Sequence, residues 1–468
     1  EGCDRSTLAR IEAQGEFTMQ VRYEELGTAP NQCTFFGSDA FILNPDGSGF
    51  VSGAPLSSQS IQSGSFLVAG AGTTNSGAQI RRVLVGCEAP SADELVGCYH
   101  ECRNGALRLR GTFRAVRAGP RAGEPEARGL RLVSESATPK PSSVTSTIPF
   151  TAADVFVTKG HAYVSVIRGG LFVFDLSNPA APVLTQHQYD PSDNYFNAVW
   201  AKGDALYVAS GTTGVRVYDI GTDPAHPQFR TSRVSPQGNG EQRNIHTLHV
   251  DGNFLYAAAN LSGSVSIYDV TDPLSPVYAG DYRPTNFDAQ RFYGPHDMRA
   301  FEGHLYVNAW EFGLYVADVT NPASPAERGH YTYPRATSHA VAVGRVNGRL
   351  LAFEGGEQWG AHLRVLDVSN PASIRLIGEY KFAQHLSIHN LELVGTKLYV
   401  AHYQAGLRVL DVSVPETPLE VAHYNTFRPT DPNRGDSFYD GAIGVRVPGD
   451  GYVYVVDTSR GLLILQEN

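Results

Sequence analysis

The chain has 468 residues, of which 42% are apolar and 18% charged, so it can bury a large core and is not a disordered protein. Its net charge is −10 and it contains no run of Lys or Arg, which argues against nucleic acid as a partner. No apolar stretch reaches the roughly 18 residues that a membrane-spanning helix needs. The chain begins at Glu1 rather than Met, which suggests that a leader was removed or left off.

The first part of the chain, residues 1–127, is expected to form a separate β-rich domain. Asn-Pro-Asp-Gly-Ser-Gly at residues 44–49 is a typical hairpin signal. Residues 108–118 alternate between polar and apolar side chains, as a half-buried strand does. These patterns predict strands but do not identify the fold of this domain.

All five cysteines lie within the first 102 residues, and the rest of the chain has none. Such clustering in one small domain predicts disulfides and therefore an extracytoplasmic location: secreted, periplasmic or on the outer cell surface. We expect two disulfides, in any of three connectivities, with Cys3 unpaired. The cysteines expected to pair are Cys33, Cys87, Cys98 and Cys102.

Two other roles for these cysteines stay open at this point. Cys98 and Cys102, with Tyr-His-Glu between them, could supply half of a zinc site, although no second close pair accompanies them. Gly2-Cys3 resembles the end of a bacterial lipoprotein signal, which would make Cys3 a lipid anchor. Cleavage at such a signal would leave Cys3 as the first residue, whereas Glu1 and Gly2 precede it.

From residue 128 to residue 468 the chain is built from one repeated motif, a run of β-forming residues followed by Asp and a polar turn that Pro closes. The first copy, Gly-Leu-Phe-Val-Phe-Asp-Leu-Ser-Asn-Pro, occupies residues 170–179, and further copies follow at intervals of about 40 to 50 residues, as propeller blades do. The other copies begin at residues 214, 264, 313, 362, 406 and 461, the last one truncated. The Asp is expected to cap the turn by accepting a hydrogen bond from a backbone amide.

The motif resembles that of the LVIVD-repeat family of bacterial β-propellers, over residues 153–468. This resemblance implies a propeller and an extracytoplasmic location, but no particular chemistry. With seven copies, the expected fold class is all-β: a seven-bladed β-propeller with a small, disulfide-stapled, β-rich N-terminal domain. Each blade should have four strands, A to D, with A innermost.

The last blade lacks a strand D, because the chain ends just after its strand C. Residues 129–134 read as a strand and are expected to supply it, which would close the ring and remove an open sheet edge. Strand direction then places the D–A and B–C loops together on one face of the propeller, which we call the top face. Long loops on a rigid scaffold are where binding usually occurs.

Four successive blades carry a histidine at the first position of strand A: His246, His296, His339 and His389. These side chains should converge at the top of the central channel. Imidazole is a common ligand of transition metals, so one Fe, Cu or Zn ion is a possible cofactor. The alternative is that each histidine bonds the backbone of a neighbouring blade.

Other top-face residues are candidates for contacting a ligand or for supporting the histidines. They are Asn197, Trp310, Glu311, Glu354, Glu357, Trp359, His402 and Tyr403. No nucleophile elbow, phosphate loop or zinc-protease motif occurs in the chain. We therefore expect an exported binding scaffold that takes a protein or a small molecule on its top face, or, alternatively, a metal-dependent enzyme that uses the four histidines.

Overall fold

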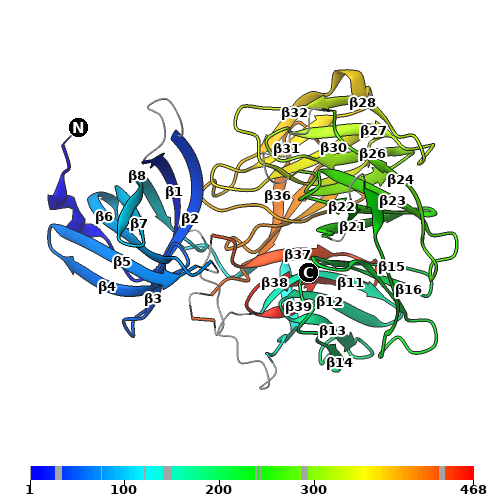
Figure 1. Cartoon of the computed structure of the whole chain (residues 1–468), viewed down its shortest axis with the longest axis horizontal. Helices are drawn as coiled ribbons and strands as arrows, with labels where there is room; N and C mark the ends of the chain where they lie inside the picture. Colours follow the sequence, from blue (N-terminus) through cyan, green and yellow to red (C-terminus); the bar gives the residue numbers. More distant parts are fainter. Residues whose placement is uncertain are drawn as a thin grey trace.

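The computed structural model of the chain describes residues 2–26, 34–74, 76–120, 123–140, 150–237, 240–242, 244–285, 294–428, 430–431 and 438–468. It is an all-β molecule with two bodies, a closed barrel and a seven-bladed propeller (Figure 1), which confirms the expected fold class. In the described part of the chain, no helix is long and apolar enough to cross a membrane.

The N-terminal domain is a closed barrel of eight antiparallel strands. β1 pairs with β2 on one side and with β8 on the other, which closes the sheet. Alternate side chains of β1 fill the interior, where Phe17, Met19 and Val21 are fully buried. The elements are η1 (Arg5–Arg10), β1 (Gly15–Glu25), β2 (Thr34–Leu43), β3 (Gly49–Val51), β4 (Ala54–Gln62), β5 (Ser65–Thr73), β6 (Gln79–Ser91), β7 (Glu94–Arg103) and β8 (Ala106–Arg117).

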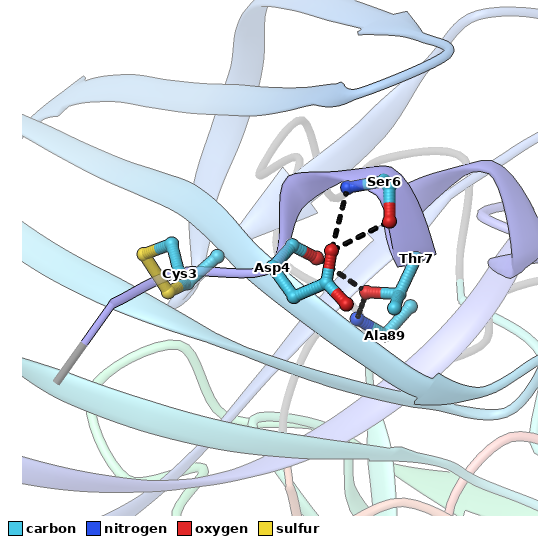
Figure 2. The surroundings of a disulfide bond; sticks show 6 residues. Cys3, Asp4, Ser6, Thr7 and Ala89 are labelled. Atoms are coloured by element: carbon cyan, nitrogen blue, oxygen red, sulfur yellow. Dashed lines mark hydrogen bonds between the residues drawn. A yellow bond between two sulfur atoms is a disulfide. The ribbon is translucent and has the colours of Figure 1, made fainter.

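The disulfide of this domain joins Cys3 to Cys87, so the expectation that Cys3 is unpaired is wrong, and with it the lipid anchor at Cys3. Asp4 caps η1 by accepting a hydrogen bond from Ser6 N, and Ala89 N of β6 donates to Thr7 Oγ1 (Figure 2). These bonds hold η1 against β6 and bring the Cα atoms of the two cysteines to 4.9 Å.

Cys98 and Cys102 are free thiols, which corrects the second expected disulfide. Both lie on β7 four residues apart, on the outward side of the strand. Their Cα atoms are therefore separated by about 13 Å along the strand, and a disulfide needs less than about 7 Å. Cys33, the remaining cysteine of the prediction, lies outside the described residues.

The seven blades are antiparallel sheets; in the first five the strands are paired in chain order, and in the last two β9 or β10 is added at the edge. Side chains of adjacent blades pack together, as Tyr306 and Val316 of blade four do with Val341 and Leu366 of blade five. Blades one to three comprise β11 (Thr151–Thr158), β12 (His161–Ile167), β13 (Gly170–Asp175) and β14 (Val183–Gln188); β15 (Phe196–Lys202), β16 (Ala205–Ser210), β17 (Gly214–Asp219) and β18 (Gln228–Arg233); and β21 (Thr247–Asp251), β22 (Phe254–Ala259), β23 (Ser264–Asp269) and β24 (Val277–Tyr282). A small hairpin of β19 (Ser235–Gln237) and β20 (Gly240–Gln242) separates blades two and three.

The remaining blades complete the ring. Blades four and five comprise β25 (Asp297–Phe301), β26 (His304–Asn308), β27 (Leu314–Asp318) and β28 (Ala326–Tyr331); and β29 (Ser338–Val346), β30 (Arg349–Gly356), β31 (Leu363–Asp367) and β32 (Arg375–Tyr380), with η2 (Pro371–Ser373) before β32. Blades six and seven comprise β33 (Leu391–Val394), β34 (Lys397–Ala401), β35 (Leu407–Asp411), β36 (Leu419–Tyr424) and β9 (Ala127–Arg128); and β37 (Ala442–Arg446), β38 (Val453–Asp457), β39 (Gly461–Glu467) and β10 (Leu130–Ser136).

The segment that follows the barrel joins the last two blades. β9 pairs with β36 at the edge of blade six, and β10 pairs antiparallel with β39 as the outermost strand of blade seven. Leu130 of β10 is 2% exposed within the core that these two blades share. The N-terminal and C-terminal parts of the propeller are therefore held in one sheet.

The Asp of each repeat caps its turn, as expected. In the six complete copies this carboxylate accepts a hydrogen bond from the backbone amide two residues later, at 2.7 to 3.1 Å. The six residues are Asp175, Asp219, Asp269, Asp318, Asp367 and Asp411. The turn that follows strand C is thus the same in each of these blades.

The barrel docks on the top face of the propeller through β1 and β2 (Figure 1). Thr18 Oγ1 donates to the carbonyl oxygen of His385 at 2.8 Å, and the backbone amide of Trp359 donates to Ser38 Oγ at 2.7 Å. Gln404 Nε2 donates to Glu16 Oε1 at 2.8 Å in a contact that is closed to solvent. The barrel therefore covers the loops of blades five and six.

Candidate functional site

The four histidines lie at the inner edge of the top face, where each strand A begins. His246 and His296 immediately precede β21 and β25, His339 is the second residue of β29, and His389 lies two residues before β33. His339 is at a register shift of the β29–β30 pair. The equivalent residue of blade two, Asn197, is at a similar shift in the β15–β16 pair. Such bulges re-aim side chains, here toward the channel mouth.

The imidazoles form a continuous row, which we call the histidine row. Ring centroids are 4.2 Å apart between His246 and His296, 4.3 Å between His296 and His339, and 4.4 Å between His339 and His389. The structure thus brings together residues that are up to 143 positions apart in the sequence (389 − 246).

The two ends of the row have hydrogen-bond partners, a backbone carbonyl at His389 and the Asn197 side chain at His246, whereas its centre has none among the described residues. His389 Nδ1 lies 2.7 Å from the carbonyl oxygen of Ile443, which fixes Nδ1 as the protonated nitrogen. At the other end, Asn197 Nδ2 donates to the carbonyl oxygen of His246 at 3.0 Å and approaches its ring. In the middle, both ring nitrogens of His339 and Nδ1 of His296 are buried without a hydrogen-bond partner among the described residues.

Burial keeps the whole row uncharged. Desolvation lowers the pKa of His246 to about 4 and that of His389 to about 3. It lowers the pKa of His296 and His339 well below the ordinary value, and the neighbouring imidazoles lower both further. Neutral imidazole is the form that binds a metal ion.

Glu357 places a buried carboxyl group beside the row. It lies just after β30, is 7% exposed, and accepts a hydrogen bond from the Tyr403 hydroxyl at 2.6 Å. Its second oxygen, Oε2, is 3.7 Å from His339 Nε2. Burial raises the pKa of this carboxyl group to about 8. Ligand atoms of His296, His339 and Glu357 all lie within 4.8 Å of one another.

Below the row, charged and aromatic side chains fill the channel. Arg446 lies over the Trp200 ring at 4.3 Å, and Asp154 accepts hydrogen bonds from the amides of Val155 and Val199. Burial raises the pKa of Asp154 to about 6. The cavity left there measures about 20 Å³, enough for a single water molecule. Among the described residues, this part of the channel is therefore too closely packed to admit a substrate.

A cleft of about 950 Å³ lies between the barrel and the top face. We call it the interdomain cleft. Six aromatic side chains supply most of its apolar lining: Phe35, Phe36, Trp310, Tyr333, Trp359 and Tyr439. Trp310 also packs on the histidine row, with its ring 5.1 Å from that of His296. The cleft and the row therefore share one wall.

Two arginines, Arg335 and Arg364, line the cleft. Arg364 is neutralised by Glu354, at 3.1 Å, and stacks on Tyr333. Arg335 is exposed, lies over the Phe36 ring at 5.5 Å, and forms no ion pair with any described carboxylate. No Asp or Glu lines the cleft in the described part of the chain. Arg335 is therefore the charged lining residue that has no ion-pair partner among the described residues.

The other residues singled out from the sequence have different positions. Glu354 and His402 are fully buried: Glu354 pairs with Arg364 and Tyr333, and His402 Nε2 lies 3.3 Å from the carbonyl oxygen of Phe382. Burial lowers the pKa of His402 to about 4. Glu311 is half-buried beside Trp310 and does not line the cleft.

The sequence did not indicate the barrel's share of the site. Phe35 and Phe36 lie at the start of β2 and are 43% and 50% exposed, which is unusual for adjacent phenylalanines. The sequence signal that could have indicated this surface is the pair of adjacent phenylalanines, Phe35 and Phe36, before an alternating strand. Cys98 and Cys102, considered above as half of a zinc site, belong to neither of the two groups of possible metal ligands among the described residues.

Comparisons with known proteins identify the repeat and the fold. The LVIVD-repeat model matches residues 151–189, 195–233, 296–333, 358–381 and 389–426. The crystal structure of the RRP9 WD40 repeats is similar with a TM-score of 0.51 and 8% sequence identity, covering 75% of this chain and 99% of that one. The structure of U3-55K is similar with a TM-score of 0.50 and 8% sequence identity, covering 73% of this chain and 100% of that one. At such identities the likeness concerns the fold alone, and no curated protein matches the chain.

Proposed function

Because this chain belongs to the LVIVD-repeat β-propellers, whose fold leaves the chemistry open, we propose its function from the interdomain cleft: it is an exported binding protein that holds a small organic anion there. The observation that carries this proposal is a cleft of about 950 Å³ with aromatic walls and a guanidinium, that of Arg335, which pairs with no described carboxylate. Ligand sites are concave, mostly apolar and equipped with few polar groups, as this one is.

The walls favour a flat, apolar ligand body. Trp359 and Trp310 of the propeller and Phe36 of the barrel all line the cleft. Aromatic rings stack on flat ligands, and such contacts are worth about 0.5–1.5 kcal/mol each beyond the area they bury. A carboxylate or sulfonate on the ligand would pair with Arg335, whose planar guanidinium matches such groups in a bidentate fashion.

A small molecule is favoured over a protein partner because the barrel already covers the loops of blades five and six. The amide of Trp359 and the side chain of Gln404 are bonded to the barrel. A protein that docked on this part of the top face would have to displace these contacts. Export is supported by the Cys3–Cys87 disulfide, since such bonds persist in oxidising compartments.

The test uses 8-anilinonaphthalene-1-sulfonate, a flat aromatic anion whose fluorescence rises on binding. We expect one site per chain in the wild type. Trp359→Ala and Arg335→Ala should each weaken binding about 10-fold, because each removes roughly 1–2 kcal/mol of stacking or ion pairing. Phe229→Ala, which removes an exposed ring from blade two, is the matched control and should bind as the wild type does. Equal affinity in all four proteins would refute the cleft as the site.

Catalysis at a metal ion is a second candidate function, favoured by one observation. Trp310 lines the cleft and also packs on His296, so a ligand in the cleft would lie close to the histidine row. Incubation of metal-loaded protein with a ligand identified for the cleft should then yield a changed product. A ligand that is bound and released unchanged, with the metal present, would refute this second function.

A further inference from the structure

The centre of the histidine row is under-satisfied. His339 is 2% exposed, and neither of its ring nitrogens has a hydrogen-bond partner in the described structure. His296 is 7% exposed and its Nδ1 is equally unpartnered. A buried polar atom without a partner costs about 1–3 kcal/mol, so three such atoms in one place need an explanation.

Glu357 adds a buried carboxyl group at the same place. Three residues earlier, Glu354 is also buried, but Arg364 and the Tyr333 hydroxyl neutralise it at 3.1 and 2.9 Å. Glu357 has no arginine or lysine against it among the described residues, only the Tyr403 hydroxyl and His339. Two buried carboxyl groups of one blade thus differ: among the described residues, Glu354 has an arginine against it and Glu357 has none.

We propose that His296, His339 and Glu357 together bind one divalent transition-metal ion, Zn(II) or Fe(II), at the mouth of the channel. The ion would give a partner to each unsatisfied nitrogen that it contacts and would favour the ionised form of Glu357, which burial disfavours. Two imidazoles and one carboxylate are the ligands of catalytic zinc sites and of non-haem iron sites, both of which leave coordination positions open. This proposal goes beyond ligand binding in the cleft and does not depend on it.

The geometry is close to that of a formed site. Tetrahedral ligands about 2.1 Å from an ion lie about 3.4 Å from one another. The His339 Nε2 to Glu357 Oε2 distance is already 3.7 Å, and the whole group spans at most 4.8 Å. Side-chain rotations that move the outer atoms by about 1 Å would therefore close the set around an ion.

The two ends of the row support the site without belonging to the ligand set. His389 donates Nδ1–H to the carbonyl oxygen of Ile443, and its ring packs against both His339 and Tyr403. His246 packs against His296 on the opposite side and is held by Asn197. These contacts restrict the rotamers of the ligands, as supporting residues do in metal sites.

The experiment measures metal binding by full-length, untagged protein. Cys98 and Cys102 are first alkylated, because their thiolates would compete for the ion. The protein is stripped with a chelator and titrated with Co(II), whose visible absorption reports nitrogen and oxygen ligands, and metal content is measured after dialysis against Zn(II) or Fe(II). We compare the wild type with His339→Asn, Glu357→Gln and His246→Asn.

The wild type should bind one ion per chain. His339→Asn and Glu357→Gln should each weaken Co(II) binding by about 100-fold or more, since even residues that only support a ligand contribute 10–100-fold. His246→Asn should weaken binding less, by about 10-fold at most, because His246 only supports His296 and blade two already carries Asn197 at the same position. Circular dichroism and the melting temperature establish that each variant is folded.

Two results would overturn the proposal. Wild-type protein that binds no Co(II) or Zn(II) would show that the centre of the row is satisfied by trapped water instead. Loss of binding in His246→Asn equal to that in His339→Asn would show that the ligands are the four histidines and not the set with Glu357. Binding of the fluorescent anion, measured on the same His339→Asn protein, shows separately whether the cleft functions.

Discussion

The barrel is tied to the propeller by a buried ion pair whose removal should measurably destabilise the protein. Arg408 of β35 is fully buried, and its guanidinium contacts both oxygens of Glu124 at 2.7 and 2.9 Å. Glu124 lies in the segment that joins the barrel to β9. The pair therefore holds this segment on blade six.

Glu124→Gln removes the charge while keeping the shape of the side chain. Breaking a buried pair by removing one partner costs about 3–5 kcal/mol. Glu420, 3.6 Å from Arg408, still compensates part of the arginine's charge in the variant. We therefore expect a loss of unfolding free energy at the lower end of this range, about 3 kcal/mol. At about 2 °C per kcal/mol for a domain of this size, the melting temperature of the propeller should fall by about 6 °C.

The effect should depend on pH in a defined direction. The pairing with Arg408 lowers the pKa of Glu124 from 4.5 to about 2, against the opposing effect of its burial. A carboxyl group with a lowered pKa stabilises the fold above its ordinary pKa and loses this contribution as the pH falls toward the folded-state value. The difference between wild type and variant should thus be full at pH 7 and shrink between about pH 4.5 and pH 2.

Differential scanning calorimetry at pH 7 and pH 3 measures both quantities. The control is Glu126→Gln, two residues along the same segment, whose ion pair with Arg428 is about half exposed and should contribute less than about 1 kcal/mol. Equal melting temperatures for the two variants at pH 7 would refute this account. So would a difference between wild type and Glu124→Gln that persists unchanged in acid.

Two further predictions concern the strand that completes blade seven and the disulfide of the barrel. Leu130→Ala, in the strand that completes blade seven, should cost about 3 kcal/mol of unfolding free energy because the side chain is 2% exposed. The control is Val183→Ala, at a site 60% exposed, which should change the free energy of unfolding measured in a urea titration by less than about 0.5 kcal/mol. An equal effect of the two substitutions would contradict the assigned role of β10. Non-reducing peptide mapping should recover Cys3 and Cys87 in one linked pair, with Cys98 alkylated in the folded protein. Replacing Cys87 with Ser should lower barrel stability by about 4.5 kcal/mol, the value for a loop of this length, and an unchanged melting temperature would show that the bond contributes nothing.

The propeller could be predicted in detail because each blade repeats the same local pattern. The Asp that caps each turn marks the end of strand C, and the spacing of the copies sets the number of blades. The convergence of His246, His296, His339 and His389 could be predicted for the same reason, since residues at equivalent positions of successive blades are neighbours around the channel. In both cases the repeat itself shows which residues are neighbours, so no separate information on long-range contacts is needed.

The cysteine pairing could not be predicted, because it depends on where a short helix packs. Asp4 and Thr7 fix η1 against β6 and so place Cys3 beside Cys87. Nothing in the spacing of the cysteines reveals this contact. The placement of Cys98 and Cys102 on one face of one strand would have excluded a bond between them, had the strand boundaries been known.

The cleft depends on contacts between residues more than 300 positions apart, such as Ser38 with Trp359. A single sequence carries no signal for such a pairing of surfaces. Glu357 was recognised as a residue of the top face, but its approach to His339 depends on the path of the loop after β30. His402 and Glu354 were placed on the same face and are instead buried beneath it.

The central claim, that the interdomain cleft is the ligand site, is tested most directly by a crystal structure of the full chain with bound 8-anilinonaphthalene-1-sulfonate. The account predicts the rings of the probe between Trp359 and Phe36, with its sulfonate at Arg335. A probe bound elsewhere on the molecule, with the cleft occupied only by water, would contradict it.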